Sequence, residues 1–216
     1  MLDDLRKINK QLNIRSIHDA CFKTYGRVIE EDVSDVLEYI SASVQPPKNE
    51  NSYIPSLQSI EQLPSIQRLS HTVYGYIDII AGLVYGHNQV LNGIEYHQGS
   101  ETIIAVTDYV LIVGHIWDMQ NNTYESSLCE CFYVPKGTIV ECYSTTLHYT
   151  PCCVSQDGFI TVCLLSRGTG DLLEDGPIGI LKKKNKWFIA HSENKEKIKS
   201  GDYPGLLGKI IKIEIK

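Results

Sequence analysis

The chain has 216 residues, of which 43% are hydrophobic and 21% are charged. This composition is typical of a soluble globular protein with one sizeable domain, or one domain with extensions. The formal net charge of −6 argues against a nucleic-acid partner, because phosphate binding usually needs a basic surface. No apolar run approaches the roughly 20 residues that cross a bilayer, and the N-terminus lacks the apolar core of a signal peptide. We therefore expect a cytoplasmic protein with no membrane partner.

The first 72 residues are predicted to be a helical and loop extension that packs on the main domain. Residues 1–25 carry apolar side chains at helical spacing, and residues 33–43 repeat that pattern after a short strand near residues 27–29. The segment 45–56, QPPKNENSYIPS, contains three prolines and is interpreted as a loop, either a plain connector or a lid. A short helical turn is expected within residues 60–70.

From residue 73 to 216 the pattern changes to short β-rich runs separated by Gly, Pro, Asn and Asp, with no helix-length segment between them. This spacing favours an antiparallel sandwich or a small barrel over an α/β fold. The tail, residues 211–216, alternates strictly between apolar and charged residues and is predicted to be an edge strand. The charge run Lys182–Lys184 is interpreted as a solvated loop. The predicted strands of the main domain are 73–84, 95–97, 101–106, 109–116, 130–134, 138–144, 158–165 and 187–190.

Metal-ligand chemistry is concentrated in the stretch YGHNQVLNGIEYHQGSE, residues 85–101. Glu95 and His97 are two positions apart, so both side chains point to the same face of a β-strand. Glu101 lies about 20 Å further along an extended chain, which is too far for one ion, so a turn is required at Gly99-Ser100. With that turn, two carboxylates and an imidazole converge, and such a donor set suits a borderline divalent cation.

A second segment supplies a fourth candidate ligand. Pro135-Lys-Gly137 is predicted to be a turn between two strands, because proline fixes one dihedral angle and glycine supplies the left-handed position. A strand over residues 138–144 follows, and then comes His148 ahead of Pro151.

These two segments together resemble the two motifs of the cupins. Glu95-x-His97-x3-Glu101 is similar to the first motif with its leading His replaced by Glu, and Pro135-x-Gly137 with His148 is similar to the second. The sequence segments GIEYHQGSE, VPKGT and TLHYTPC also resemble a bacterial cupin family catalogued only as a domain of unknown function. That resemblance runs from about residue 74 to 167 and returns at residues 185–191 and 208–214.

The resemblance implies a mainly β fold, a cupin-type jelly-roll barrel with an N-terminal helical extension. It also implies one divalent metal ion in the barrel mouth, held by Glu95, His97, Glu101 and His148; the alternative is a barrel that has kept the fold and lost the metal. Two imidazoles and two carboxylates favour manganese, iron or zinc. Because cupins commonly pair through edge strands or swapped termini, a homodimer is expected.

Three further residues are candidates for catalysis. Glu141 is a candidate general base if its side chain faces the cavity, and a solvated edge position if it does not. Tyr85 is one of several possible hydroxyl donors, although most tyrosines in the chain are expected to serve packing. Lys186 is a candidate for binding a substrate carboxylate or phosphate at the rim, with a surface salt bridge as the alternative.

Three functions stay open on the sequence. The first is a metal-dependent enzyme for a small polyhydroxylated or carboxylated metabolite, with aldose–ketose isomerisation as the leading reaction. The second is a carbon–nitrogen lyase that resembles the cupin-like ureidoglycolate lyases. The third is a non-catalytic cupin that binds a metabolite. Four protein ligands leave at most two open positions on a metal, so an oxygenase ranks lower.

Overall fold

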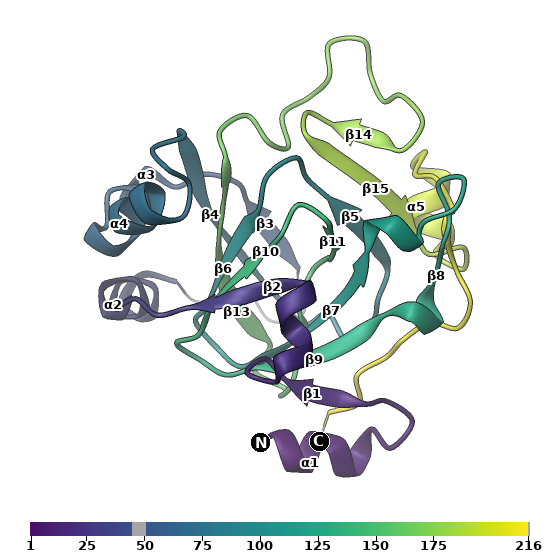
Figure 1. The fold of residues 1–216 in the computed structure, drawn as a ribbon, viewed down its shortest axis with the longest axis horizontal. Coiled ribbons are helices and arrows are strands. Elements are labelled where there is room, and N and C mark those ends of the chain that lie inside the picture. Colours follow the sequence, from purple (N-terminus) through teal and green to yellow (C-terminus); the bar gives the residue numbers. More distant parts are fainter. Residues whose placement is uncertain (45–50, 216) are drawn as a thin grey trace.

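The computed structural model describes residues 1–44 and 51–215, which form two β-sheets that face each other, with helices over one outer side (Figure 1). The first sheet has the strand order β2-β10-β6-β13-β4-β3. The strands of this sheet are β2 Gly26–Ile29, β10 Ile139–Cys142, β6 Glu101–Ala105, β13 Phe159–Ser166, β4 Ile79–Gly86 and β3 Ser52–Ile54.

The opposing sheet has the order β1-β9-β7-β11, and β12 also pairs with β7. A three-stranded sheet, β14-β15-β5, continues it through an antiparallel bridge between Glu95 and His148. The bounds are β1 Ile14–Ser16, β9 Glu130–Val134, β7 Tyr109–His115, β11 Thr146–Leu147, β12 Cys152–Cys153, β14 Leu181–Lys183, β15 Lys186–Ala190 and β5 Gly93–Tyr96.

The connectivity is that of a jelly roll. From β4 to β13 the chain passes repeatedly from one sheet to the other, so that strands adjacent within a sheet are distant in sequence, as in β10-β6-β13-β4. This double Greek-key arrangement is how an antiparallel protein closes two sheets around one core. The mainly β, cupin-type jelly-roll fold expected from the sequence is confirmed.

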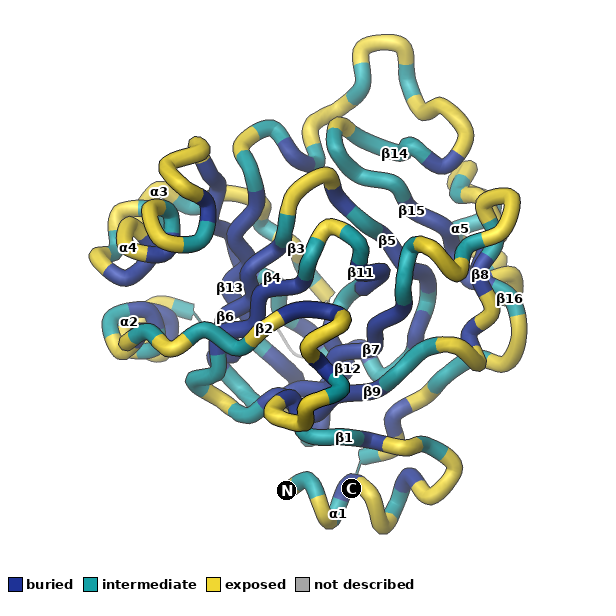
Figure 2. Tube along the Cα trace, viewed as in Figure 1, coloured by how far each residue is buried: buried dark blue, intermediate teal, exposed yellow. Residues whose placement is uncertain are grey.

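The strands of the two sheets are largely buried (Figure 2), and side-chain alternation along them divides the core into layers. On β6, Ile103 and Ala105 point between the two sheets, while Ile104 points outward and packs under the helices. Val36 and Leu69 come from those helices and are fully buried. This period of two follows from the pleat of the strand. The helices over this face are α2 Ser34–Ser43, α3 Gln58–Glu61 and α4 Pro64–Thr72.

The N-terminal extension does more than pack on the barrel, because three of its segments are strands of the two sheets. Residues 1–25 are not mainly helical: α1 covers Leu2–Ile8, β1 then pairs in parallel with β9, and a short 3-10 helix, η1, covers Ala20–Thr24. Ile14 and Ile17 are buried against the sheet, so tertiary packing overrides the helical spacing. Part of the predicted loop, residues 45–50, lies outside the described residues, and its later part forms the edge strand β3.

The C-terminal tail lies beside residues 89–91 but is not a regular strand. Ile211 accepts a hydrogen bond from Leu91, Ile213 donates one to Gln89, and Ile213 is fully buried. The expected alternation is present, and only the bridge Val90–Lys212 is formed. None of the helices in the described residues is long and apolar enough to span a bilayer. The remaining elements are η2 Ile116–Asp118, β8 Tyr124–Glu125, η3 Ser126–Leu128, α5 Lys195–Lys199 and β16 Leu206–Leu207.

Asn9 ties the two ends of the chain together and supplies a test of the fold. Its buried side chain donates to the carbonyls of Leu5 and Glu214, and its Oδ1 accepts from the Glu214 amide at 2.8 Å. We expect Asn9→Ala to lower the free energy of unfolding by about 2 kcal/mol, because it leaves backbone groups of Glu214 without partners. That loss corresponds to about 4–8 °C in Tm, measured by thermal denaturation. The exposed Asn13→Ala is the matched control, and equal Tm values for both variants would contradict the account.

Candidate metal centre

Glu95 and His148, one from each half of the motif pair, are joined through their backbones. The Glu95 amide donates to the His148 carbonyl at 2.8 Å, and the His148 amide donates to the Glu95 carbonyl at 3.0 Å. This exchange places the two side chains on the same side of the bridge. Gly99 adopts a φ of 106° in the turn that follows His97, and the chain then returns as β6 with Glu101 at its start. The predicted turn at Gly99-Ser100 is therefore present.

Both histidines are oriented by backbone carbonyls. The Nδ1 of His97 lies 2.8 Å from the Asn185 carbonyl, and the Nδ1 of His148 lies 2.9 Å from the Thr146 carbonyl. A carbonyl can only accept, so Nδ1 carries the proton in each ring. Each Nε2 is then directed at the carboxylates. Such outer contacts fix the tautomer that a metal-binding histidine needs.

The distances fit a single divalent cation. His97 Nε2 lies 3.4 Å from Glu101 Oε2 and 3.8 Å from Glu95 Oε1, and His148 Nε2 lies 2.9 Å from Glu101 Oε2. One ligand atom from each of the four residues lies within 4.8 Å of all the others. Ligand atoms about 2.1 Å from a common ion are about 3.0–3.4 Å apart at tetrahedral or right angles. All four side chains are buried, so the spacing is set by the core.

The charges in the cluster also favour a cation. The buried His97 Nε2 has no hydrogen-bond partner among the described residues, an arrangement that costs free energy unless something else occupies the space. Burial by itself would raise the pKa of Glu101, but the His148 and His97 imidazoles reverse that effect and hold it well below its usual range. Burial would lower the pKa of His148, and Glu101 instead raises it. The cluster can hold a metal ion through these four residues.

The cluster forms the floor of a cavity of about 160 Å³ between the sheets. The apolar side chains of Ile103 and Leu165 line it together with Cys163. Burial raises the pKa of the Cys163 thiol well above its usual value, so it is not a nucleophile in this environment. The rest of the wall comes from Tyr53, Val84, Tyr149, Thr150, Pro151, Thr169, Gly170, Lys183 and Lys186.

Of the three predicted catalytic residues, the structure brings only Lys186 to this cavity. Its Nζ lies 2.5 Å from Glu95 Oε2. Burial would lower the pKa of Lys186, but the charge of Glu95 outweighs burial and raises it. Lys186 is therefore a partly buried, protonated group beside the candidate ligands, and its salt bridge lies in the cavity wall rather than on the open surface.

Glu141 and Tyr85 lie away from the cavity. Glu141 is opposite Arg27 across β10 and β2 and forms an ion pair with it at 2.5 Å, while its neighbours Val140 and Cys142 fill the space between the sheets. Glu141 is therefore on the outer face of the barrel and is not an inward base. Tyr85 packs with the layer under the helices, since it alternates with Val84, which lines the cavity.

Several residues of the site were not expected from the sequence. Lys183 was interpreted as part of a solvated charge run, yet it lines the cavity, while its neighbour Lys182 pairs with Asp202. Tyr53, from the predicted loop, also lines the cavity. Asn185 was missed although it occupies a left-handed turn with φ of 54°. An Asn flanked by lysines is a turn signal in the sequence, but only the fold shows which residues the turn contacts.

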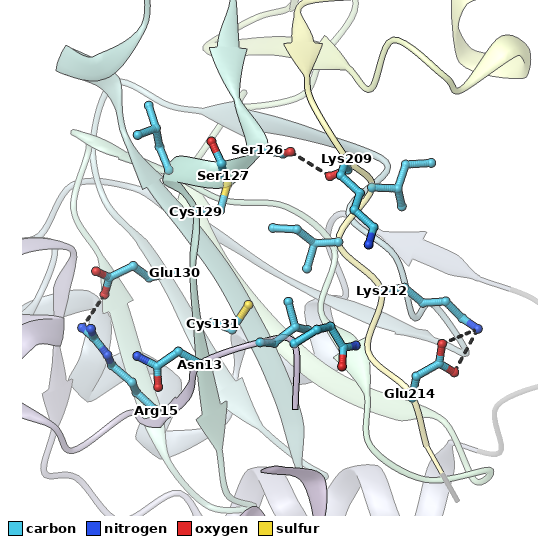
Figure 3. A pocket seen from close by; sticks show the side chains of 15 residues that line it. Asn13, Arg15, Ser126, Ser127, Cys129, Glu130, Cys131, Lys209, Lys212 and Glu214 are labelled. Atoms are coloured by element: carbon cyan, nitrogen blue, oxygen red, sulfur yellow. Dashed lines mark hydrogen bonds and ion pairs between the residues drawn. The ribbon is translucent and has the colours of Figure 1, made fainter. Parts of the chain in front are cut away.

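A larger cavity, of about 700 Å³, lies elsewhere and is drawn in Figure 3. It is bordered by residues 11–15 and 209–214 and contains none of the predicted site residues. Cys129 and Cys131 face it, and burial raises the pKa of both thiols, that of Cys131 to about 12. Arg15 is paired with Glu130 on its wall. No cluster of metal-ligating residues is found there within the described ranges.

Asn185 connects the β14–β15 hairpin to the candidate ligands, and this connection generates a prediction. Besides the carbonyl bond to His97, its side chain bonds both the amide and the carbonyl of Gln98 and the hydroxyl of Thr169. Asn185→Gly keeps the positive φ and removes all three side-chain bonds. We expect metal affinity to fall by about 10- to 100-fold, as for other losses of outer contacts.

The affinity is measured by titrating Co(II) and following its visible absorption. Asn121→Gly is the matched control, because Asn121 is exposed and also has a positive φ, of 50°. Unchanged Co(II) affinity in Asn185→Gly would show that the His97 orientation does not depend on this hairpin.

Solved structures with similar folds were found at low identity. EvdO2 from Micromonospora carbonacea var. aurantiaca, complexed with 2-oxoglutarate, is 9% identical over 71% of this chain and 92% of that chain, with a TM-score of 0.48. A mutant of the oxalate decarboxylase OxdC of Bacillus subtilis is 11% identical over 45% of this chain, with a TM-score of 0.31. A mutant salicylate 1,2-dioxygenase of Pseudoaminobacter salicylatoxidans, in complex with gentisate, is 8% identical over 72% of this chain, with a TM-score of 0.31.

The chain spans only 24% and 35% of the length of the decarboxylase and the dioxygenase, respectively. No curated protein matches the sequence. A family model described as "Domain of unknown function (DUF4867)" matches residues 14–211, which is most of the chain. The protein therefore belongs to the DUF4867 family, and its jelly-roll barrel carries a buried Glu/His cluster suited to a metal ion.

Proposed function

We propose that this protein is a metal-dependent cupin enzyme that acts on a small polyhydroxylated or carboxylated metabolite, and that its reaction is an aldose–ketose isomerisation. The observation that carries the proposal is the buried cluster of two imidazoles and two carboxylates beside a cavity. Manganese, iron and zinc all suit such a donor set. A divalent cation bound there would polarise a carbonyl oxygen and make the neighbouring C–H more acidic.

The two glutamates have different surroundings, and this supports different roles. Glu101 Oε2 is close to both histidines, at 2.9 and 3.4 Å. Glu95 lies further from His97, at 3.8 Å, and its other oxygen contacts Lys186. We assign Glu101 with His97 and His148 as the main ligand set. Glu95 is either a fourth ligand or, through its second oxygen, the general base.

In the isomerisation, Glu95 takes the proton from the hydroxyl-bearing carbon beside the carbonyl and returns it to the former carbonyl carbon, while the proton of that hydroxyl moves to the former carbonyl oxygen. Lys186, held protonated by Glu95, stabilises the oxygen on which negative charge develops. Both groups lie in the cavity wall within contact of each other, so the acid and the base are positioned on one side of a bound substrate. The apolar residues of the wall limit the access of water.

A lyase acting on a ureido acid is the second candidate. The observation that favours it is the presence of two lysines in the cavity wall, which suit a substrate carboxylate. A non-catalytic metabolite-binding protein would use the same cavity and would bind its ligand stoichiometrically without turnover. A cytoplasmic location and a homodimer stay predictions from the sequence.

Substitution of the two histidines tests the metal site. We expect His97→Ala and His148→Ala to lose most of the bound Mn, Fe or Zn, because each removes one of the two nitrogen ligands. The measurement is the metal-to-protein ratio of purified protein by elemental mass spectrometry. The exposed His18→Ala is the control for a general loss of histidine. Metal content that survives both cavity substitutions unchanged would refute the site.

The proton transfer is tested by solvent exchange. In D2O, an isomerase introduces deuterium at the carbon beside the carbonyl of an aldose, and the incorporation is followed by NMR. We expect Glu95→Gln to lower kcat by about 10²- to 10⁴-fold, the usual cost of losing a general base. Glu141→Gln is the control, because that carboxylate lies outside the cavity.

Metal content distinguishes the two roles of Glu95. A variant that keeps its metal but loses exchange identifies a base, whereas one that loses both identifies a ligand. If Glu141→Gln abolished deuterium exchange and Glu95→Gln kept it, the assignment of Glu95 would be contradicted. Release of urea from a ureido acid, without exchange on any aldose, would favour the lyase.

A further inference from the structure

Two lysines of the β14–β15 hairpin face the same cavity. Lys183 and Lys186 are directly paired across the two antiparallel strands, and both line the cavity above the metal cluster. Like charges placed directly opposite each other on a sheet repel and destabilise it. An anion between two lysines paired in this way at the wall of a cavity would relieve that repulsion.

The partners of the two lysines differ. Lys186 contacts Glu95, whereas the side chain of Lys183 forms no ion pair within the described part of the chain. Lys182, one position earlier, has its own partner in Asp202 at 2.7 Å. Lys183 thus stands at the cavity as a cation without a counter-charge from the protein.

The charge balance of the cavity also favours a bound anion. Among the described residues, the acidic members of its wall are Glu95 and Glu101, and a divalent cation would neutralise these two carboxylates. The charges of both lysines would then be uncompensated in a partly buried space, where an unpaired charge is costly. An ammonium group has three donors, so Lys186 can keep Glu95 and still bind an additional oxygen.

We propose that the substrate carries a carboxylate that Lys183 and Lys186 bind together, while its hydroxyl or carbonyl oxygens face the metal cluster. The substrate is therefore a sugar acid, which carries a terminal carboxylate besides its carbonyl and hydroxyl groups, rather than a neutral sugar. This inference rests on the proposed metal-dependent function. A carboxylate is favoured over a phosphate because no arginine is among the described residues that line the cavity, and arginine is the side chain that best matches phosphate geometry.

The test compares two four-carbon probes on protein loaded with Mn(II). Threonate and threitol have the same hydroxylated skeleton and differ in the terminal carboxylate. Isothermal titration calorimetry is expected to show threonate binding about tenfold or more tightly, the size of a charge-assisted contact. Lys183→Met is expected to remove most of that preference. Lys184→Met is the matched control, since Lys184 is exposed and is not part of the cavity wall.

A second variant separates binding by the lysines from binding by the metal. Lys186→Arg keeps the charge and should retain part of the threonate preference, while Lys186→Met should lose it with the metal content unchanged. A preference for threonate that persists in both Lys183→Met and Lys186→Met would show that the carboxylate binds the metal alone, and would overturn the proposal. Inorganic phosphate that displaces threonate at lower concentration than acetate does would assign the lysines to a phosphate instead.

The two proposals fail in different ways. Equal affinity for threonate and threitol on protein with stoichiometric metal would overturn the carboxylate and leave the metal-dependent function standing. Protein that binds no metal under any loading condition would overturn the proposed function and the carboxylate together.

Discussion

The backbone bridge between Glu95 and His148 is the contact on which the candidate site depends. The two residues are 53 positions apart in the sequence, and the exchange of two hydrogen bonds at 2.8 and 3.0 Å fixes them side by side. The bridge also connects the β14-β15-β5 sheet to the sheet that contains β11. A one-residue slip in this pairing would turn one of the two ligands to the opposite face of its strand. The metal cluster and the closure of the barrel therefore require the same register.

The β14–β15 hairpin completes the site although it belongs to neither motif segment. Its turn residue Asn185 orients His97, its strand residue Lys186 holds Glu95, and Lys183 adds a further positive charge. The other side of β15 packs into the core, where Trp187 stacks on Tyr96 with ring centroids 5.1 Å apart. Because alternate residues of one strand serve the core and the cavity, the polar groups are held on a rigid support.

Burial determines how strongly the charged groups of the cluster affect one another. At a protein surface, two carboxylates and two imidazoles within a few ångströms would each be solvated. Their effects on one another's pKa values would then be small. In the barrel, burial makes every charge depend on its neighbours, so Glu101 and His148 shift each other's pKa values in opposite directions. The same burial makes Lys186 dependent on Glu95. The four candidate ligands and Lys186 are therefore electrostatically coupled in one cavity.

The sequence by itself determined that the main domain is an antiparallel sandwich or barrel, and its resemblance to the two cupin motifs implied the jelly roll and the four candidate ligands. The reason is that a period of two, a required turn at Gly99 and the spacing of two short motifs are local signals. The same alternation could not tell which face of a strand is inside the barrel. The sequence therefore left Glu141 open as an inward base or a solvated edge residue, and the structure places it against Arg27. The sequence also could not show that Ile14 would pair with β9 rather than continue a helix. Only the tertiary structure decided these points, because inward and outward faces and pairing partners are set by contacts between residues far apart in the chain.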